Sequence, residues 1–144
     1  MATHEDSQLS RRNFFWRFGA VFFALLARPK AAKAGKKIAL PLDKLVGVAS
    51  VGGSMLIKAA GHEILLVRTS EKAIAAFNPI CTHEKCTVAF DKSAGNIQCP
   101  CHHSIYSVEG ANVKGPAPRP LQVYPSEIAD NRLVIDLGEP EAKS

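Results

Sequence analysis

The chain has 144 residues, of which 47% are hydrophobic and 22% are charged, enough for one globular domain and a targeting segment. Its net charge of +5 is concentrated at one end, because residues 1–34 carry six basic and two acidic side chains. Residues 35–144 carry twelve basic and eleven acidic side chains and are nearly neutral. No basic patch with interleaved aromatic residues is present, so we expect no nucleic-acid partner.

The first 34 residues have the features of an export signal. Residues 10–15, SRRNFF, contain an arginine pair and resemble the twin-arginine signal of bacteria. The apolar run at 18–27 is much shorter than the roughly 20 residues that span a bilayer, and residues 32–34, AKA, offer a cleavage site before Gly35. We predict a signal that is cleaved there. An uncleaved membrane anchor and an amphipathic or loosely ordered tail remain alternatives.

From Lys36 onward the chain alternates short β-branched or aliphatic runs with Gly, Asn, Asp and Pro, a pattern typical of strands and turns. Two runs flank Gly61 and predict a hairpin, two flank a turn at 91–95, and the last two flank Asp130 and Asn131. The predicted strands are residues 54–60, 62–68, 72–77, 87–90, 96–99, 121–124 and 132–137. We therefore predict an all-β domain of several small antiparallel sheets over residues 35–144.

Two short runs carry the chemistry, CTHEKC at 81–86 and CPCHHSIY at 99–106. They contain all four cysteines of the chain and three of its five histidines. The spacings Cys-x-His and Cys-x-x-His supply two thiolates and two imidazoles. Taken alone, these residues also fit two disulfides, with three possible pairings, or a structural zinc site with two cysteines and two histidines.

The two runs closely resemble the cluster-binding loops of the Rieske iron–sulfur family, and the resemblance extends over about residues 76–121. It implies one [2Fe–2S] cluster per chain, with Cys81 and Cys99 on one iron and His83 and His102 on the other. It also implies the Rieske fold of small stacked antiparallel sheets, with both loops at one tip of the domain.

The same resemblance assigns roles to the surrounding residues. Cys86 and Cys101 stand where the family has a disulfide between the loops. The Ser104 hydroxyl would donate to a bridging sulfide and the Tyr106 hydroxyl to a cysteine sulfur, and both bonds raise the cluster potential. Residues 115–121, GPAPRPL, resemble the stiff proline loop that covers the cluster. The disulfide and this loop resemble the Rieske subunits of cytochrome bc complexes, whereas the ferredoxins of aromatic-ring hydroxylation lack the disulfide.

Three residues depart from the family pattern. Glu84 stands where quinol-oxidising members usually have an apolar residue, and Lys85 and His103 replace glycines. Glu84 and Lys85 form either a solvated surface pair or an altered docking face. A carboxylate near His83 is expected to favour the protonated imidazole and to lower the potential.

These features predict a periplasmic protein that transfers one electron at a time. The leading hypothesis is the iron–sulfur subunit of a bacterial quinol–cytochrome c reductase, held at the periplasmic face of the inner membrane beside a cytochrome b subunit. There His83 or His102 would hydrogen-bond quinol and take its proton, and a c-type cytochrome would accept the electron. The alternative is a soluble periplasmic carrier, or the small subunit of a periplasmic oxidase, with no catalysis of its own.

Overall fold

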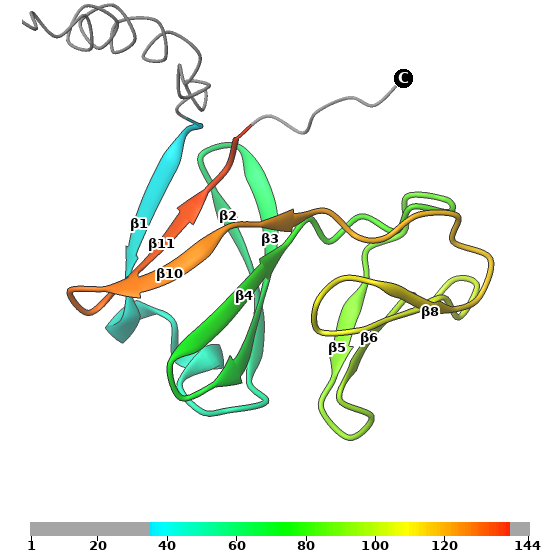
Figure 1. Ribbon diagram of the computed structural model, residues 1–144, viewed down its shortest axis with the longest axis horizontal. Helices are drawn as coiled ribbons and strands as arrows, with labels where there is room; N and C mark the ends of the chain where they lie inside the picture. The colour runs from blue at the N-terminus through cyan, green and yellow to red at the C-terminus, as the bar shows by residue number, and fades with distance from the viewer. Residues whose placement is uncertain (1–34, 139–144) are drawn as a thin grey trace, which may run out of the picture. The chain divides into compact units, whose positions relative to one another are not determined.

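The computed structural model describes residues 35–138, which form eleven strands and two short 3-10 helices (Figure 1). The helices are η1 (Leu42–Lys44) and η2 (Val46–Val48). The strands are β1 (Lys37–Pro41), β2 (Ser54–Ala59), β3 (His62–Ser70), β4 (Ala73–Phe77), β5 (Ala89–Asp91), β6 (Asn96–Gln98), β7 (Ile105–Tyr106), β8 (Asn112–Lys114), β9 (Val123–Tyr124), β10 (Ser126–Ala129) and β11 (Arg132–Asp136). The all-β prediction is confirmed.

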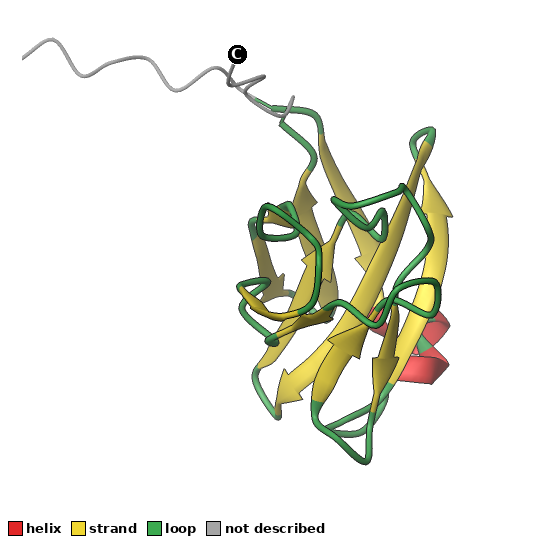
Figure 2. Ribbon diagram, turned by 90° about the vertical axis from the view of Figure 1, so that its right-hand side faces the viewer, coloured by secondary structure: helices red, strands yellow, loops and turns green. Residues whose placement is uncertain are grey.

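The strands form three antiparallel sheets, in the orders β1-β11-β10, β2-β3-β4-β9 and β5-β6-β7-β8. The predicted hairpin at Gly61 is present, and Ala59 of β2 pairs with His62 of β3 across its turn. Figure 1 shows the sheet of β5 to β8 beside the sheet of β2, β3, β4 and β9. Figure 2 shows that strands and loops make up most of residues 35–138. The third sheet carries the second motif, which begins directly after β6 and ends with β7.

Strand β3 is buried on both faces and separates two hydrophobic cores. Side chains alternate between the two sides of a strand. Ile64 and Leu66 therefore pack with the sheet of β1, β10 and β11, and Leu65 and Val67 pack with the sheet of β5 to β8. The second core also contains Cys81, Cys99 and Tyr106. Cys81 of the first motif and Cys99 of the second are thus anchored in the hydrophobic interior.

The prediction for the last hairpin was wrong. The turn at Asp130 and Asn131 joins β11 to β10, not to the predicted strand at 121–124. Within that predicted strand, Val123 and Tyr124 form β9 and pair with β4 in another sheet. Pro125 separates β9 from β10, and because proline has no N–H to donate, it interrupts strand pairing where the chain passes between sheets.

The predicted twin-arginine signal, apolar run and cleavage site within residues 1–34 lie outside the described residues. Within residues 35–138, no helix has the length and apolar character needed to cross a membrane.

Candidate metal centre

The two motif loops are built in the same way. In the first, the Cys81 carbonyl accepts a hydrogen bond from the Lys85 amide at 3.1 Å, and in the second the Cys99 carbonyl accepts one from His103 at the same distance. Lys85 and His103 have φ angles of 58° and 56°, in the left-handed region where glycine is favoured. This conformation explains why glycine is usual at both positions in the resembling family. Each loop therefore turns tightly after its first cysteine.

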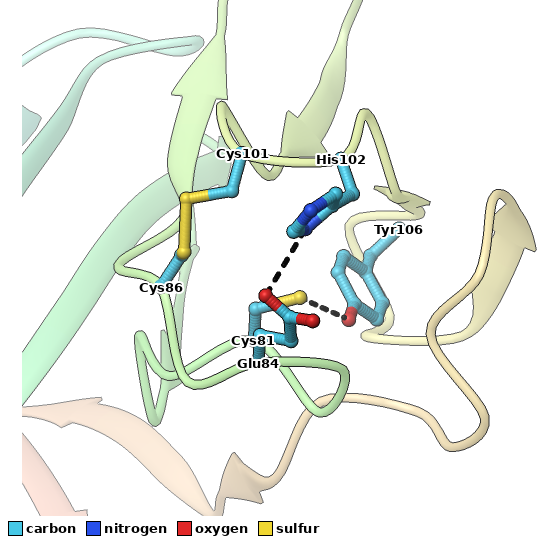
Figure 3. Close-up of a disulfide and its surroundings, with 6 residues drawn as sticks. All are labelled: Cys81, Glu84, Cys86, Cys101, His102 and Tyr106. Atoms are coloured by element: carbon cyan, nitrogen blue, oxygen red, sulfur yellow. Dashed lines mark hydrogen bonds and ion pairs between the residues drawn. A yellow bond between two sulfur atoms is a disulfide. The ribbon is translucent and has the colours of Figure 1, made fainter.

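A disulfide joins the two loops. Cys86 at the end of the first loop is bonded to Cys101 in the second, as the resemblance implied (Figure 3). A crosslink of this sequence separation, 15 residues, typically stabilises a fold by about 3 kcal/mol. After this pairing, each loop still has one free cysteine and one candidate histidine that can bind a metal.

The four candidate ligands form two pairs. Cys81 and Cys99 are buried free cysteines that pack in the same hydrophobic core. The imidazole rings of His83 and His102 lie with their centroids 4.8 Å apart and their planes at 87°. The His102 side chain is 44% exposed, so this imidazole is open to an approaching partner.

Tyr106 forms a hydrogen-bond network with the first loop. Its buried hydroxyl lies 3.2 Å from Cys81 Sγ and accepts a hydrogen bond from the Thr82 amide at 3.3 Å. Burial raises the pKa of Tyr106, and its hydrogen bond to Cys81 adds to that increase, so the phenol stays protonated. Burial alone would raise the pKa of Cys81, but hydrogen bonds from Tyr106, Cys99 and the amides of His83 and Glu84 lower it. The pocket thus favours a thiolate at Cys81.

The proline loop is fastened to the site by three hydrogen bonds. The Ala117 amide donates to Ser104 Oγ at 3.2 Å, Asn112 Nδ2 donates to the Ala117 carbonyl at 2.6 Å, and Thr82 Oγ1 donates to the Arg119 carbonyl at 2.7 Å. The loop begins at Gly115, which has a φ of +98°, and a Cβ there would lie 2.6 Å from the Ser104 Cα. The close approach of this loop to the second motif therefore requires glycine.

Glu84 lies beside His102. Its Oε2 is 3.7 Å from His102 Nδ1, and both side chains are well exposed. A dashed line marks this contact in Figure 3. The sequence prediction considered its effect on His83 and a possible pairing with Lys85. Among the ion pairs within residues 35–138, Lys85 does not appear, whereas Glu84 does.

The sequence indicated no role for Thr82 or Asn112, and it placed Ala117 only within the proline loop. Thr82 stands between two candidate ligands, a position that could have drawn attention to its side chain. Asn112 and Ala117 carry no comparable signal, because their hydrogen bond depends on the path of the proline loop.

Comparison with known proteins identifies the family. The Rieske [2Fe-2S] domain family matches residues 46–125, more than half of the chain. The chain belongs to the Rieske family. The cytochrome b6-f complex iron-sulfur subunit of Gloeobacter violaceus is 35% identical over 109 residues, covering 72% of this chain and 58% of that protein. That of Chlorobaculum tepidum is 34% identical over 105 residues, with the same coverage of both chains. This Rieske chain therefore matches just over half the length of each relative.

A solved structure supports the same conclusion. The cyanobacterial plasma membrane Rieske protein PetC3 of Synechocystis PCC 6803 has a TM-score of 0.56 and 27% identity, covering 70% of this chain and 98% of that one. The ferredoxin of carbazole 1,9a-dioxygenase from Nocardioides aromaticivorans IC177 has a TM-score of 0.57 at 20% identity, and it shares 71% of this chain and 98% of its own. At that identity, the second likeness concerns the fold alone.

The site fits the Rieske-type [2Fe–2S] cluster that the family implies, and this cluster is the cofactor of the domain. Nδ1 of His83 is buried without a hydrogen-bond partner among residues 35–138, as expected of a nitrogen that binds metal. The buried thiols of Cys81 and Cys99 are soft ligands suited to iron. Ser104 Oγ accepts from the Ala117 amide, which leaves its own hydrogen available to donate into the site.

Proposed function

We propose that this domain transfers one electron at a time as the iron–sulfur subunit of a quinol-oxidising cytochrome bc-type complex on the periplasmic side of a bacterial membrane. The observation that carries the proposal is the pair of loops joined by the Cys86–Cys101 disulfide, each with one buried cysteine and one candidate histidine ligand. The similarity to cytochrome b6-f complex iron-sulfur subunits supports a cytochrome b partner.

In this proposal Cys81 and Cys99 hold one iron, and His83 and His102 hold the other. The cluster supplies a one-electron acceptor whose potential is raised by the replacement of two thiolates with imidazoles. The protein would exclude water from the iron held by the two cysteines, because both cysteines are buried. The exposed His102 imidazole would hydrogen-bond the quinol and hold its proton at a ring nitrogen that does not bind iron.

The residues around the cluster have positioning roles in this proposal. Tyr106 and Ser104 donate hydrogen bonds to cluster or cysteine sulfur and so favour the reduced, more negative state. The proline loop excludes water from the cluster, and its hydrogen bonds to Thr82, Ser104 and Asn112 hold it in place. The acceptor in this proposal is a c-type cytochrome.

A second candidate is a soluble periplasmic Rieske carrier, or the small subunit of a periplasmic oxidase. The polar character of the exposed loops favours this second candidate. Among residues 35–138, none of the large exposed hydrophobic side chains lies in the loops at 81–86, 99–104 or 115–120. Glu84 and Lys85 are exposed there instead. Such a polar face suits a soluble partner better than an apolar quinol pocket.

Intact mass measurement on separated membrane and periplasmic fractions tests the two candidates. A membrane-bound chain that retains residues 1–34, and whose cluster is reduced by quinol only when cytochrome b is present, supports the first. A periplasmic chain that begins at Gly35 and is not reduced by quinol contradicts the first and supports the second. Iron and acid-labile sulfide analysis of the same fractions tests the cluster itself.

A further inference from the structure

Three of the four cysteine sulfurs of the chain form one group. The Sγ atoms of Cys86, Cys99 and Cys101 lie within 4.8 Å of one another. The fourth cysteine, Cys81, is buried in the same hydrophobic core as Cys99. Cys99 therefore lies near both sulfurs of the disulfide and shares its core with the other buried cysteine.

The spacing of these sulfurs suits a single tetrahedral metal ion once the disulfide is open. Zinc–sulfur bonds of about 2.3 Å place the sulfurs of a tetrahedral site about 3.8 Å apart. Cys99 Sγ lies within 4.8 Å of both disulfide sulfurs, so each of these two distances would shorten by about 1 Å at most. The two disulfide sulfurs, which are bonded to each other, would instead have to move apart to about 3.8 Å. Cys86 and Cys101 are not fully buried, and after reduction their sulfurs can separate by side-chain rotation without movement of the buried pair.

We propose that the chain with reduced Cys86 and Cys101 forms a second, tetrathiolate site for a soft divalent ion such as Zn²⁺, built from all four cysteines. Zinc proteins commonly use four thiolates in structural sites of this kind. If the proposed cluster ligands are correct, the new site and the cluster exclude each other, because both require Cys81 and Cys99. The disulfide then has a selective role, since it removes two competing thiolates and leaves two thiolates with two imidazoles.

Opening the disulfide requires a reductant, and binding the ion then releases protons. A thiol or phosphine reductant supplies two electrons that break the Cys86–Cys101 bond, and it becomes a disulfide or a phosphine oxide. The two sulfurs take up two protons. Binding of the ion as a tetrathiolate then releases about four protons, one from each thiol. In a chain newly made in a reducing compartment, the disulfide has not formed and no reduction is needed.

With this site, the order of cluster insertion, disulfide formation and zinc binding decides which metal the chain holds. Zinc binds more tightly than ferrous iron at most sites with the same ligands. A reduced chain is therefore exposed to capture by zinc until either the cluster is inserted or the disulfide forms. Loss of the disulfide would harm cluster loading through a wrong metal as well as through lower stability.

The test uses the full chain, produced without its cluster, and Co²⁺ as a spectroscopic probe of thiolate ligation. The double variant His83→Ala/His102→Ala removes both imidazoles. With a phosphine reductant, we expect it to bind one Co²⁺ with sulfur-to-cobalt charge-transfer bands, and we expect those bands to be lost once the disulfide is formed. Adding Cys86→Ser and Cys101→Ser should abolish the bands under reducing conditions as well. Absence of the bands in the reduced double variant would overturn the proposal.

A second measurement on the wild-type chain keeps the test independent of the folding of the variant. Zinc is added in weak buffer with a pH indicator. The reduced chain should release about twice as many protons per zinc as the oxidised chain, which has only two free thiols. Equal proton release would contradict the tetrathiolate site. Neither result depends on iron, so a failure here is distinct from failure of cluster loading, which iron and sulfide analysis of the oxidised chain measures separately.

Discussion

Replacing Tyr106 with phenylalanine removes one hydroxyl from the buried side of the cluster site and leaves the ring in place. That hydroxyl accepts a hydrogen bond from the Thr82 amide, which leaves its own hydrogen for an acceptor. Two acceptors lie in range, Cys81 Sγ at 3.2 Å and Thr82 Oγ1 at 3.3 Å. Because Thr82 donates its own hydroxyl hydrogen to the Arg119 carbonyl, its oxygen can accept one from the tyrosine. The hydrogen bond to sulfur is therefore shared with a competitor.

The size of the effect follows from this geometry. A hydrogen bond to a charged group contributes about 1.5 to 3 kcal/mol, and only the difference between the reduced and oxidised states changes the potential. With the competing threonine, we take that difference as about 1 kcal/mol, which corresponds to about 40 mV for one electron. The bond stabilises the more negative reduced state, so Tyr106→Phe should lower the midpoint potential by about 40 mV.

Redox titration of the cluster-loaded full chain, followed by its visible circular dichroism at fixed pH and salt, measures this shift. Tyr124→Phe is the matched control, because Tyr124 is also buried but lies in the other core. It should leave the potential unchanged. A Tyr106→Phe potential equal to that of the wild type, with urea unfolding showing an intact fold, would refute the role of this hydroxyl.

Three further predictions concern the same site. Ser104→Ala should lower the potential in the same titration and cost about 1 kcal/mol of stability, whereas Ser126→Ala, which loses a hydrogen bond remote from the site, should cost stability alone. Glu84→Leu should raise the potential by at most about 40 mV at low salt, because a carboxylate 3.7 Å from the exposed imidazole contributes about 1 kcal/mol in water, and an unchanged or lower value would contradict this. Lys85→Gly should raise the free energy of unfolding by about 1 kcal/mol in urea melts, because φ is positive there. Lys92→Gly, at a position outside the set with positive φ, should instead lower that free energy, and an equal response of the two variants would contradict the argument.

The sequence predicted the strands that carry a strong local signal. The hairpin around Gly61 combines two long apolar runs with a residue that readily takes positive φ, and the structure has φ of 87° there. Strand β10 was missed because Ser126–Ala129 is short and only partly buried, so its pairing with β11 decides its conformation. Strands β7 and β8, of two and three residues, were missed for the same reason. Short strands depend on partners that are distant in the sequence.

The candidate site was predicted as a set of residues but not as a network. Spacing and residue type singled out Cys81 and His83 as candidate ligands, because thiolates and imidazoles are rare and chemically distinctive. The hydrogen bond from Thr82 to the carbonyl of Arg119 joins residues 37 positions apart, and no local sequence pattern predicts it. Nor did the sequence show that the Glu84 carboxylate would lie beside His102, since that contact requires the two loops to meet.

The structure separates the buried features of the candidate cluster site from the exposed ones. The thiols of Cys81 and Cys99 and the hydroxyl of Tyr106 are buried in the second core, so a change there alters packing and potential together. Glu84 and Lys85 are exposed, and their substitution removes little packing. The resemblance implies other residues at both positions in quinol-oxidising proteins, so the exposed part of the first loop differs from theirs there. The difference should therefore appear in the choice of partner and in the salt dependence of electron transfer, more than in the chemistry of the cluster.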